Sequence, residues 1–296
     1  MAIPESQLET WSHQGAITTS KNTYASIRST LQDSNSPFAD KDFKVFLQGS
    51  YGNDTNIRAD SDVDVVMRLD SIFRGNLQAL PPEQQAAYHS AFSNATYTFS
   101  QFKQAVIGHL QRTYGQHYVR LGNKSVKVLA NSGRLGADVV ICHQYRDYKR
   151  FINTSDQSYD EGIIFTASTG SEIVNYPTLH RDNCTTKHQA TKSWFKPTVR
   201  MFKNMRGRLI DAGGIATGTA PSYFIEGMLY NVPDGKFGGP FDDTFCECVN
   251  WLRDTDLSKL VCANYKHWLF GSDSVQWSQD NCKAYLNALV NLWNRW

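Results

Sequence analysis

The chain has 296 residues, of which 41% are hydrophobic, enough for one large globular domain or two packed lobes. Thirty basic and 28 acidic residues leave a net charge of only +2, so no overall field favours binding to a long nucleic acid. No apolar run approaches the roughly 18 residues of a membrane span. The polar start MAIPESQLET predicts no signal peptide, and six cysteines without a CxxC pair are typical of a reduced, cytoplasmic protein.

The first third of the chain predicts helices around one short strand. Residues 5–32 place apolar side chains at helical spacing, with a break or bend near Gly15. Residues 43–47 alternate well enough for a strand, which leads into the turn Gly49-Ser50. A long helix is expected from Glu83 to about Thr113.

The middle of the chain predicts further strands. Residues 118–121, 125–130 and 136–142 are short apolar segments joined by connections that contain glycine. Residues 162–165 and 171–174, separated by a polar loop, predict a hairpin. The sheet therefore continues to about residue 176.

The last part of the chain predicts helices. They are expected at 185–209, from 222 after Pro221, at 241–254 and at 279–294. Strands thus concentrate before residue 176 and helices after it. This order predicts an α+β fold, with a catalytic lobe over 1–176 packed on a helical lobe over 177–296.

Two carboxylates separated by one valine give the strongest chemical signal. Asp62 and Asp64 fall on one face of a predicted strand, and apolar neighbours would hold them in a core where like charges need cations. Asp138 opens a later apolar strand, and three such carboxylates can bind two divalent cations. Alternatively, the aspartates cap turns or pair with Arg58 and Arg134.

Two further features suit a polyphosphate. The turn Gly49-Ser50 offers backbone N–H groups and a hydroxyl. On the predicted helix, Lys196, Arg200 and Lys203 follow i, i+4 and i+7 spacing, so one face carries three cations. A solvated helix face explains the same spacing.

A histidine and cysteine pattern raises the question of zinc. His180, Cys184 and His188 are four residues apart and could present three ligands on one helical face. Because no fourth ligand is evident, we interpret them as ordinary core residues.

These segments resemble a known family. Gly49-Ser50, then Thr55-Asn56-Ile57-Arg58 and Asp60-Ser61-Asp62-Val63-Asp64-Val65, resemble the active-site signature of polymerase-β-type nucleotidyltransferases. More narrowly, they are similar to the bacterial CD-NTases, relatives of animal cyclic GMP-AMP synthase and oligoadenylate synthase. Residues 195–204 resemble the family's spine helix and residues 220–226 the segment that faces the nucleotide, so the likeness covers roughly residues 40–235.

The resemblance implies a polymerase-β-like catalytic lobe and a set of site residues. Asp62, Asp64 and Asp138 would be the catalytic ligands of two Mg²⁺ ions, with Mn²⁺ as a substitute. The donor nucleotide would contact Gln48, Gly49, Ser50, Lys203, Ser222 and Tyr223. By residue type alone, Tyr223 is better explained as a core aromatic, and only its place after Ser222 favours contact with a base.

The resemblance also implies an activity. The enzyme would join nucleoside triphosphates, first of all ATP and GTP, into a cyclic oligonucleotide, with a cyclic dinucleotide as the leading expectation. The product would be a second messenger in the antiphage defence called CBASS, and pyrophosphate would be released. The alternatives are transfer to a tRNA end or an aminoglycoside hydroxyl, or a nucleotide-binding regulator without catalysis.

The expected partners are few. We expect a monomer that binds no membrane and no long nucleic acid. The chain shows no counterpart of the animal DNA sensor's zinc module, which argues against activation by DNA. Control by a partner protein stays open. The bases joined, their linkage and the ring size lie beyond the sequence.

Overall fold

The computed structural model describes residues 2–15, 17–57, 62–273 and 275–296. The chain forms two compact units. The sheet unit comprises residues 18–48 and 60–178, and the helical unit comprises residues 1–17, 49–59 and 179–296. The predicted lobes 1–176 and 177–296 remain a prediction as functional domains, but as packing units the segments 1–17 and 49–59 group with the C-terminal helices.

The sheet unit is built on a seven-stranded mixed sheet in the order β1-β2-β5-β4-β3. β6 pairs with the second half of β5, and β7 pairs with β6. β2 and β5 run parallel, whereas the other pairs are antiparallel. The strands are β1 (Phe43–Leu47), β2 (Val63–Asn76), β3 (Val119–Leu121), β4 (Val126–Val128), β5 (Ala137–Asn153), β6 (Asp156–Thr166) and β7 (Glu172–Asn175). The predicted α+β class is confirmed.

β5 and β6 extend beyond the segments that the sequence predicts. Their added part, residues 143–162, is rich in charged side chains and lacks a plain apolar alternation. It forms a strand pair because Tyr148 and Phe151 are buried in a small apolar cluster. Cross-strand contacts add to this, as where Lys149 Nζ donates to Asp160 Oδ1 at 2.9 Å.

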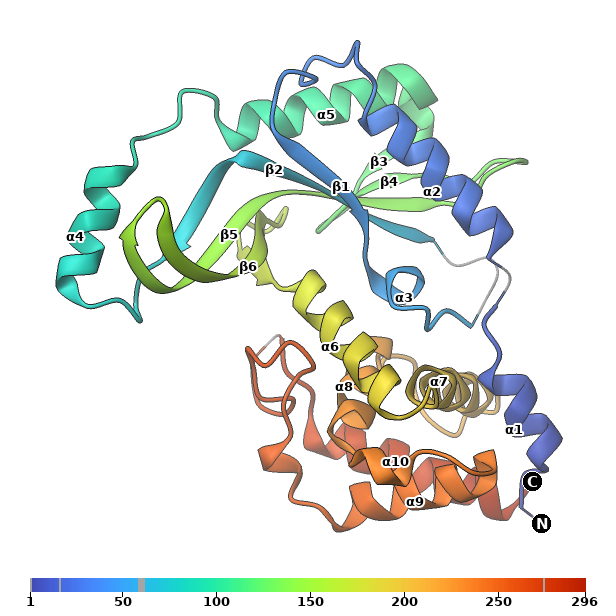
Figure 1. The fold of residues 1–296 in the computed structure, drawn as a ribbon. Coiled ribbons are helices and arrows are strands. Elements are labelled where there is room, and N and C mark those ends of the chain that lie inside the picture. The colour runs from blue at the N-terminus through green and yellow to red at the C-terminus, as the bar shows by residue number, and fades with distance from the viewer. Residues whose placement is uncertain (1, 16, 58–61, 274) are drawn as a thin grey trace. The chain divides into compact units, whose positions relative to one another are not determined.

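Three helices belong to the sheet unit. They are α2 (Thr18–Leu31), α4 (Pro82–Ala91) and α5 (Phe99–Tyr114), followed by the short helix η1 (Gln116–Tyr118). α2 and α5 lie on the same face of the sheet in Figure 1, and they bury Ile27, Phe102 and Leu110 completely.

The single helix predicted over 83–113 is wrong, since α4 and α5 are separate. Phe92 adopts extended backbone angles that end α4. Thr98 and Gln101 then form a reciprocal capping box that starts α5. The sequence carries this signal as a threonine followed three residues later by a glutamine.

The helical unit surrounds α7 (Phe195–Asp211), which buries Phe195, Val199 and Phe202 completely. The other helices are α1 (Glu5–Ser12), α3 (Gly49–Gly52), α6 (Pro177–Ala190), α8 (Ser222–Asn231), α9 (Phe241–Asp254) and α10 (Gln279–Asn294), with the short helices η2 (Asp234–Lys236) and η3 (Leu257–Lys259). In the described part of the chain, no helix combines the length and apolar character that crossing a membrane requires.

Two predictions about helix ends have opposite outcomes. The break near Gly15 is confirmed, because α1 ends at Ser12 and α2 begins at Thr18. The continuous helix over 185–209 is wrong. α6 and α7 are separated where Lys192 and Ser193 adopt positive φ angles of 48° and 71°, which no helix interior permits.

Candidate functional site

The three predicted aspartates meet at the start of β2 and β5. Because these strands are parallel, Asp64 and Asp138 are register neighbours in the sheet. Asp62 precedes β2 by one residue. Val63 and Val65 beside them are completely buried and hold this end of the strand in the core.

Asp64 has an altered acidity. Burial, followed by the charges of Asp138 and Asp62, raises the pKa of the Asp64 carboxyl to about 6, and Lys127 opposes this only in part. The cluster therefore carries more negative charge than its own residues neutralise. A divalent cation relieves this kind of imbalance.

Two residues of the β4 region contact the aspartates, and the sequence did not single them out. Lys127 Nζ lies 3.4 Å from Asp62 Oδ2 and 3.3 Å from Asp138 Oδ2. Ser125 Oγ donates a hydrogen bond of 2.9 Å to Asp138 Oδ1. Lys127 and Asp138 are opposite each other across β4 and β5. The Val126-Lys127-Val128 alternation was the available signal for the lysine's face.

Gly136 makes room for Asp62. A Cβ atom added at this glycine would lie 2.1 Å from Asp62 Oδ1, far inside van der Waals contact. A side chain at position 136 would therefore displace the carboxylate.

The alternative pairing of the aspartates with arginine is wrong for Arg134. Its guanidinium lies 4.7 Å from the ring centre of Tyr114, and its Nη2 donates to Leu129 O at 2.8 Å. Arg58, Asp60 and Ser61 lie outside the described residues.

The predicted turn before the aspartates lies partly in each unit. Gln48 belongs to the sheet unit, where its backbone N–H donates to Asp64 O at 3.0 Å. Gly49 has a φ of 64°, a left-handed angle that favours glycine. Ser50 follows in α3 of the helical unit, and its carbonyl accepts from Thr55 N at 2.9 Å. Contact of this turn with a triphosphate stays a prediction.

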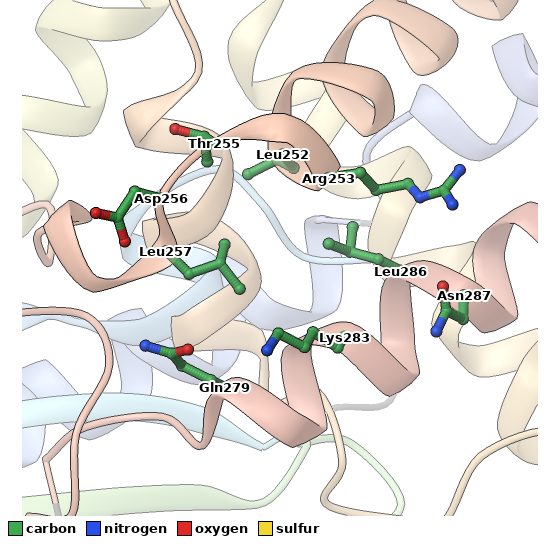
Figure 2. A pocket seen from close by; sticks show the side chains of 9 residues that line it. All are labelled: Leu252, Arg253, Thr255, Asp256, Leu257, Gln279, Lys283, Leu286 and Asn287. Carbon is green, nitrogen blue, oxygen red and sulfur yellow. The ribbon is translucent and has the colours of Figure 1, made fainter.

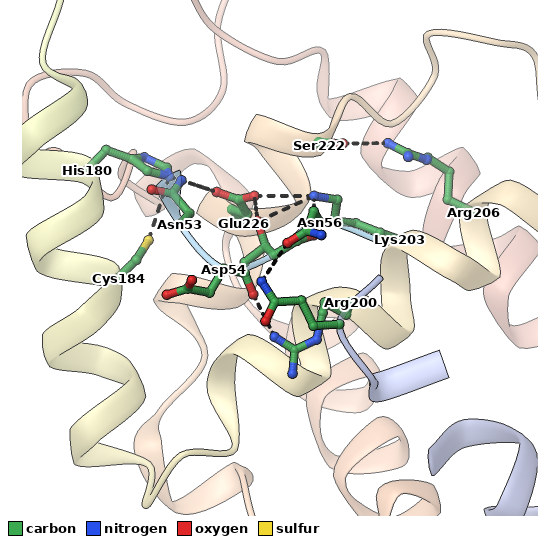
Figure 3. A network of polar contacts seen from close by, with 12 residues as sticks. Asn53, Asp54, Asn56, His180, Cys184, Arg200, Lys203, Arg206, Ser222 and Glu226 are labelled. Atoms are coloured by element: carbon green, nitrogen blue, oxygen red, sulfur yellow. Dashed lines mark hydrogen bonds and ion pairs between the residues drawn. The ribbon is translucent and has the colours of Figure 1, made fainter. Parts of the chain in front are cut away.

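In the helical unit, Glu226 is the centre of a buried polar network (Figure 3). Its Oε2 accepts hydrogen bonds of 2.9 Å from Asn53 Nδ2 and pairs with His180 Nε2 at 2.9 Å. Its Oε1 accepts from Thr55 Oγ1 at 2.6 Å and lies 3.6 Å from Lys203 Nζ. Burial would raise the pKa of Glu226, but His180 and Lys203 outweigh it and hold that pKa at about 2.

The predicted cationic face of α7 exists, and it contacts the loop 53–57. Lys196 Nζ lies 3.0 Å from Asp54 Oδ2, and Arg200 Nη1 donates to Asp54 O at 2.6 Å. Lys203 Nζ donates to Thr55 O at 2.7 Å, with a side chain only 2% exposed. All three cations thus have protein acceptors, so the solvated-face alternative is wrong and contact of Lys203 with a triphosphate stays a prediction.

Ser222 and Tyr223 open α8. Ser222 Oγ accepts from Arg206 Nη1 at 3.1 Å. The ring of Tyr223 stacks on His180 with 4.9 Å between ring centres, and its hydroxyl accepts from Asn264 Nδ2 at 3.3 Å. One face of the Tyr223 ring is therefore covered, as a core aromatic would be. Stacking on a nucleobase stays a prediction.

The histidine and cysteine pattern gathers a different third residue. His180, Cys184 and Glu226 are the one group of three such side chains, within the described ranges, whose ligand atoms all lie within 4.8 Å. Both carboxylate oxygens of Glu226 are already engaged by the four partners named above, so we interpret these residues as a hydrogen-bond network rather than a metal site. His188 instead accepts from Lys196 N at 3.4 Å. The three aspartates are correspondingly more widely spaced than this group.

Two cavities lie outside these clusters. One of about 440 Å³ between α9, η3 and α10 contains none of the predicted site residues (Figure 2). Its lining includes buried leucines, and exposed polar side chains such as Arg253 and Lys283 also line it. A smaller one of about 140 Å³ in the sheet unit includes Ser125 among its lining residues.

Comparison with known proteins identifies the family. Residues 182–294 match the model of the cGAS/DncV-like nucleotidyltransferase C-terminal helical domain. The chain is 48% identical to the cyclic UMP-AMP synthase of Rhodothermus marinus, over all of this chain and 99% of that protein. The chain belongs to the CD-NTase family. This CD-NTase is also 36% identical to the cyclic nucleotide synthase CdnE01 of Staphylococcus haemolyticus over the full length of both proteins.

The solved structures agree with the predicted fold. The structure of the Rhodothermus marinus CdnE c-UMP-AMP synthase with Apcpp and Upnpp has a TM-score of 0.90 and 47% identity, covering 99% of this chain and 97% of that one. The more distant dinucleotide cyclase DncV of Vibrio cholerae, 12% identical, shares the fold with a TM-score of 0.56, over 98% of this chain and 79% of that one. The polymerase-β-like fold and the nucleotidyltransferase class predicted from the sequence are confirmed. The chain is accordingly a nucleotidyltransferase of the cyclic-oligonucleotide synthase type.

Proposed function

We propose that this CD-NTase joins ATP and UTP into cyclic UMP-AMP and releases pyrophosphate. The observation that carries the proposal is the 48% identity, over the whole chain, to a cyclic UMP-AMP synthase. A solved structure named for the same activity, with Apcpp and Upnpp, supports it. The pair ATP and GTP, expected from the sequence, remains the competing prediction.

The aspartate cluster is proposed as the site of two Mg²⁺ ions, with Mn²⁺ as a substitute. The residues fit such ions, because three carboxylates supply the hard oxygen ligands that Mg²⁺ prefers. The raised pKa of Asp64 marks a negative charge that the protein leaves uncompensated. When bound, the ions supply neutralisation of the triphosphate and activation of a ribose hydroxyl.

The chain's own residues position the reaction. The ribose hydroxyl oxygen of one nucleotide forms a bond to the α-phosphorus of the other, and the bond from that phosphorus to the departing pyrophosphate breaks. Asp138, whose side chain is 21% exposed, is proposed to accept the hydroxyl proton. Ser125 would hold Asp138 in place for this step through its hydrogen bond to Oδ1. A second transfer of the same kind closes the ring.

The donor contacts are proposed from the family resemblance. Gln48, Gly49 and Ser50 would border the triphosphate, and Lys203, Ser222 and Tyr223 would be further contacts of the donor nucleotide. For Lys203, its bonds to Thr55 support an additional role in fixing the loop 53–57.

We also propose a cellular role, a location and an oligomeric state for the enzyme. A cyclic dinucleotide made by a CD-NTase would act as a second messenger in antiphage defence. We propose a cytoplasmic monomer, and we leave open whether a partner protein controls it. Sedimentation of the purified protein and fractionation of expressing cells test the monomer and its location.

A product assay tests the proposed activity. The enzyme is incubated with Mg²⁺ and each pair of the four ribonucleoside triphosphates, and products are resolved by mass spectrometry. We expect cyclic UMP-AMP from ATP with UTP, and no product from the double variant Asp62→Asn with Asp64→Asn. A dominant cyclic GMP-AMP product would overturn the choice of UTP, and the absence of any phosphodiester product would overturn the activity.

A further inference from the structure

Lys127 forms ion pairs with two of the proposed metal ligands. Among the described residues, the ion pairs of Asp62 and Asp138 both run to this one lysine, at 3.4 and 3.3 Å. A single ammonium thus bridges Asp62, just before β2, and Asp138, at the start of β5. Its positive charge lies where cationic charge is needed, although one lysine does not balance three aspartates.

The exposure of the Lys127 side chain allows it to move away from the two carboxylates. Its side chain is 47% exposed, so the ammonium is already partly hydrated and can move fully into water. An ammonium on a flexible four-carbon stem is a mobile point charge, unlike a buried arginine. The contrast with Lys203, whose side chain is only 2% exposed, shows that lysines in the same protein are fixed where a permanent contact is needed.

We propose that Lys127 is an internal counter-ion of the metal-free enzyme, displaced when the metal ions bind, and that it thereby sets the affinity of the site for metal. This inference rests on the proposed role of the aspartates as metal ligands. Before metal binds, Lys127 screens Asp62 and Asp138 and keeps their carboxylates in place. Because the ammonium and a divalent cation seek the same oxygens, each weakens the binding of the other.

A merely structural role predicts something different. Lys127 and Asp138 oppose each other across antiparallel strands, and such a pair ordinarily stabilises the sheet. Loss of a structural pair would loosen the aspartates and weaken metal binding. Loss of a competing counter-ion would tighten it.

The test uses Mn²⁺ alone as the probe, with free Mn²⁺ measured by electron paramagnetic resonance and no nucleotide present. The variants are Lys127→Met and Lys127→Gln, which guards against a folding defect in one of them. Lys124→Met is the matched control, since Lys124 is exposed, lies three residues earlier and takes no part in the described ion pairs of Asp62 and Asp138. The double variant Asp62→Asn with Asp64→Asn defines binding elsewhere on the protein.

We expect both Lys127 variants to bind Mn²⁺ roughly three- to tenfold more tightly than the wild type, the range that two partly exposed ion pairs allow. Lys124→Met is expected to stay within about twofold, because its charge is screened from the site. In EDTA, the Lys127 variants should also melt below the wild type, and Mn²⁺ should reduce that difference.

Each other outcome overturns the inference. Unchanged or weaker Mn²⁺ binding in the Lys127 variants would show a structural pair and leave the proposed function standing. Equal tightening in Lys124→Met would show a general charge effect. If wild-type binding is no stronger than that of the double aspartate variant, the metal site itself fails together with the counter-ion.

Discussion

The aspartate cluster of the sheet unit and the Glu226 network of the helical unit are both built from carboxylates and cations, yet they differ in charge balance. Glu226 is 3% exposed and faces Lys203 and His180. The cluster of Asp62, Asp64 and Asp138 has ion pairs, among the described residues, to one half-exposed lysine. The Glu226 carboxylate is thus buried and compensated by cations, whereas the aspartate cluster is more exposed and only partly compensated.

The pKa values of Glu226 and Asp64 reflect this difference in charge compensation. Burial by itself would raise the pKa of both Glu226 and Asp64. Neighbouring cations reverse the effect at Glu226, whose pKa falls to about 2, while neighbouring carboxylates reinforce it at Asp64, whose pKa rises to about 6. Carboxylates are therefore compensated by cations in the helical unit and left without full compensation in the sheet unit.

The largest expected effect is loss of activity when the unbalanced cluster loses a charge. Asp64→Asn should lower the rate of cyclic dinucleotide synthesis by on the order of 10³-fold, because it removes a proposed ligand of the catalytic ions. Product formation is followed by mass spectrometry under saturating triphosphates. The control Glu172→Gln removes an exposed acid of the same unit, and it should retain activity. Comparable losses in both variants would contradict a specific role of Asp64.

The balanced network should respond in stability. Glu226→Ala leaves His180 and Lys203 buried without their counter-charge, and we expect a loss of about 3 kcal/mol or more in the free energy of unfolding. Urea denaturation followed by circular dichroism measures it. Glu247→Gln breaks the exposed pair with Lys236 and should cost less than about 0.5 kcal/mol. A Glu226 variant as stable as the wild type would show that the network is not a scaffold.

A substitution beside the aspartate cluster should lower the activity and leave the free energy of unfolding nearly unchanged. Gly136→Ala places a methyl group where the Asp62 carboxylate lies, and the carboxylate can turn away at little cost in packing. We expect activity to fall by roughly 10- to 100-fold, as small misplacements in active sites do. The free energy of unfolding should change by less than about 1 kcal/mol. Unchanged activity would show that the position of Asp62 is not critical.

A further expected effect is a pH dependence of the stability of the helical unit. Burial would lower the pKa of His180, but interactions with Cys184 and Glu226 outweigh it and raise that pKa to about 10. A raised histidine pKa contributes stability that is fully present below pH 6.5 and is lost as the pH rises towards 10. The stability difference between wild type and His180→Gln should therefore shrink over this interval. Urea titrations at several pH values measure it, and a constant difference would contradict the charged pair.

The sequence predicted the aspartate cluster well, because the signal is local. Alternation along residues 62–67 sets the face of the carboxylates, and an acid at the head of an apolar strand marks Asp138. The parallel pairing of β2 and β5 then brings Asp64 and Asp138 into register. Gly136 and Ser125 stayed unnoticed, because their roles depend on contacts between strands that no local pattern encodes.

The Glu226 network could not be predicted in the same way. Thr55 and Glu226 are 171 residues apart in the chain, so nothing near either residue indicates the bond. The spacing of Lys196, Arg200 and Lys203 correctly indicated a cationic face, but the partner proved to be the loop 53–57. The helix break at Lys192 and Ser193 was missed because neither residue type signals a positive φ angle.

One measurement tests the central claim, that the aspartate cluster is unbalanced in the metal-free protein and the Glu226 network is not. It is the free energy of unfolding of Asp64→Asn, determined by urea denaturation in EDTA near pH 7.5. Removing a buried charge that has too little compensation should stabilise the inactive variant by about 1 to 3 kcal/mol, in line with a pKa raised to about 6. A loss of stability like that expected for Glu226→Ala would contradict the account, because it would show that the charge of Asp64 is already balanced by the protein.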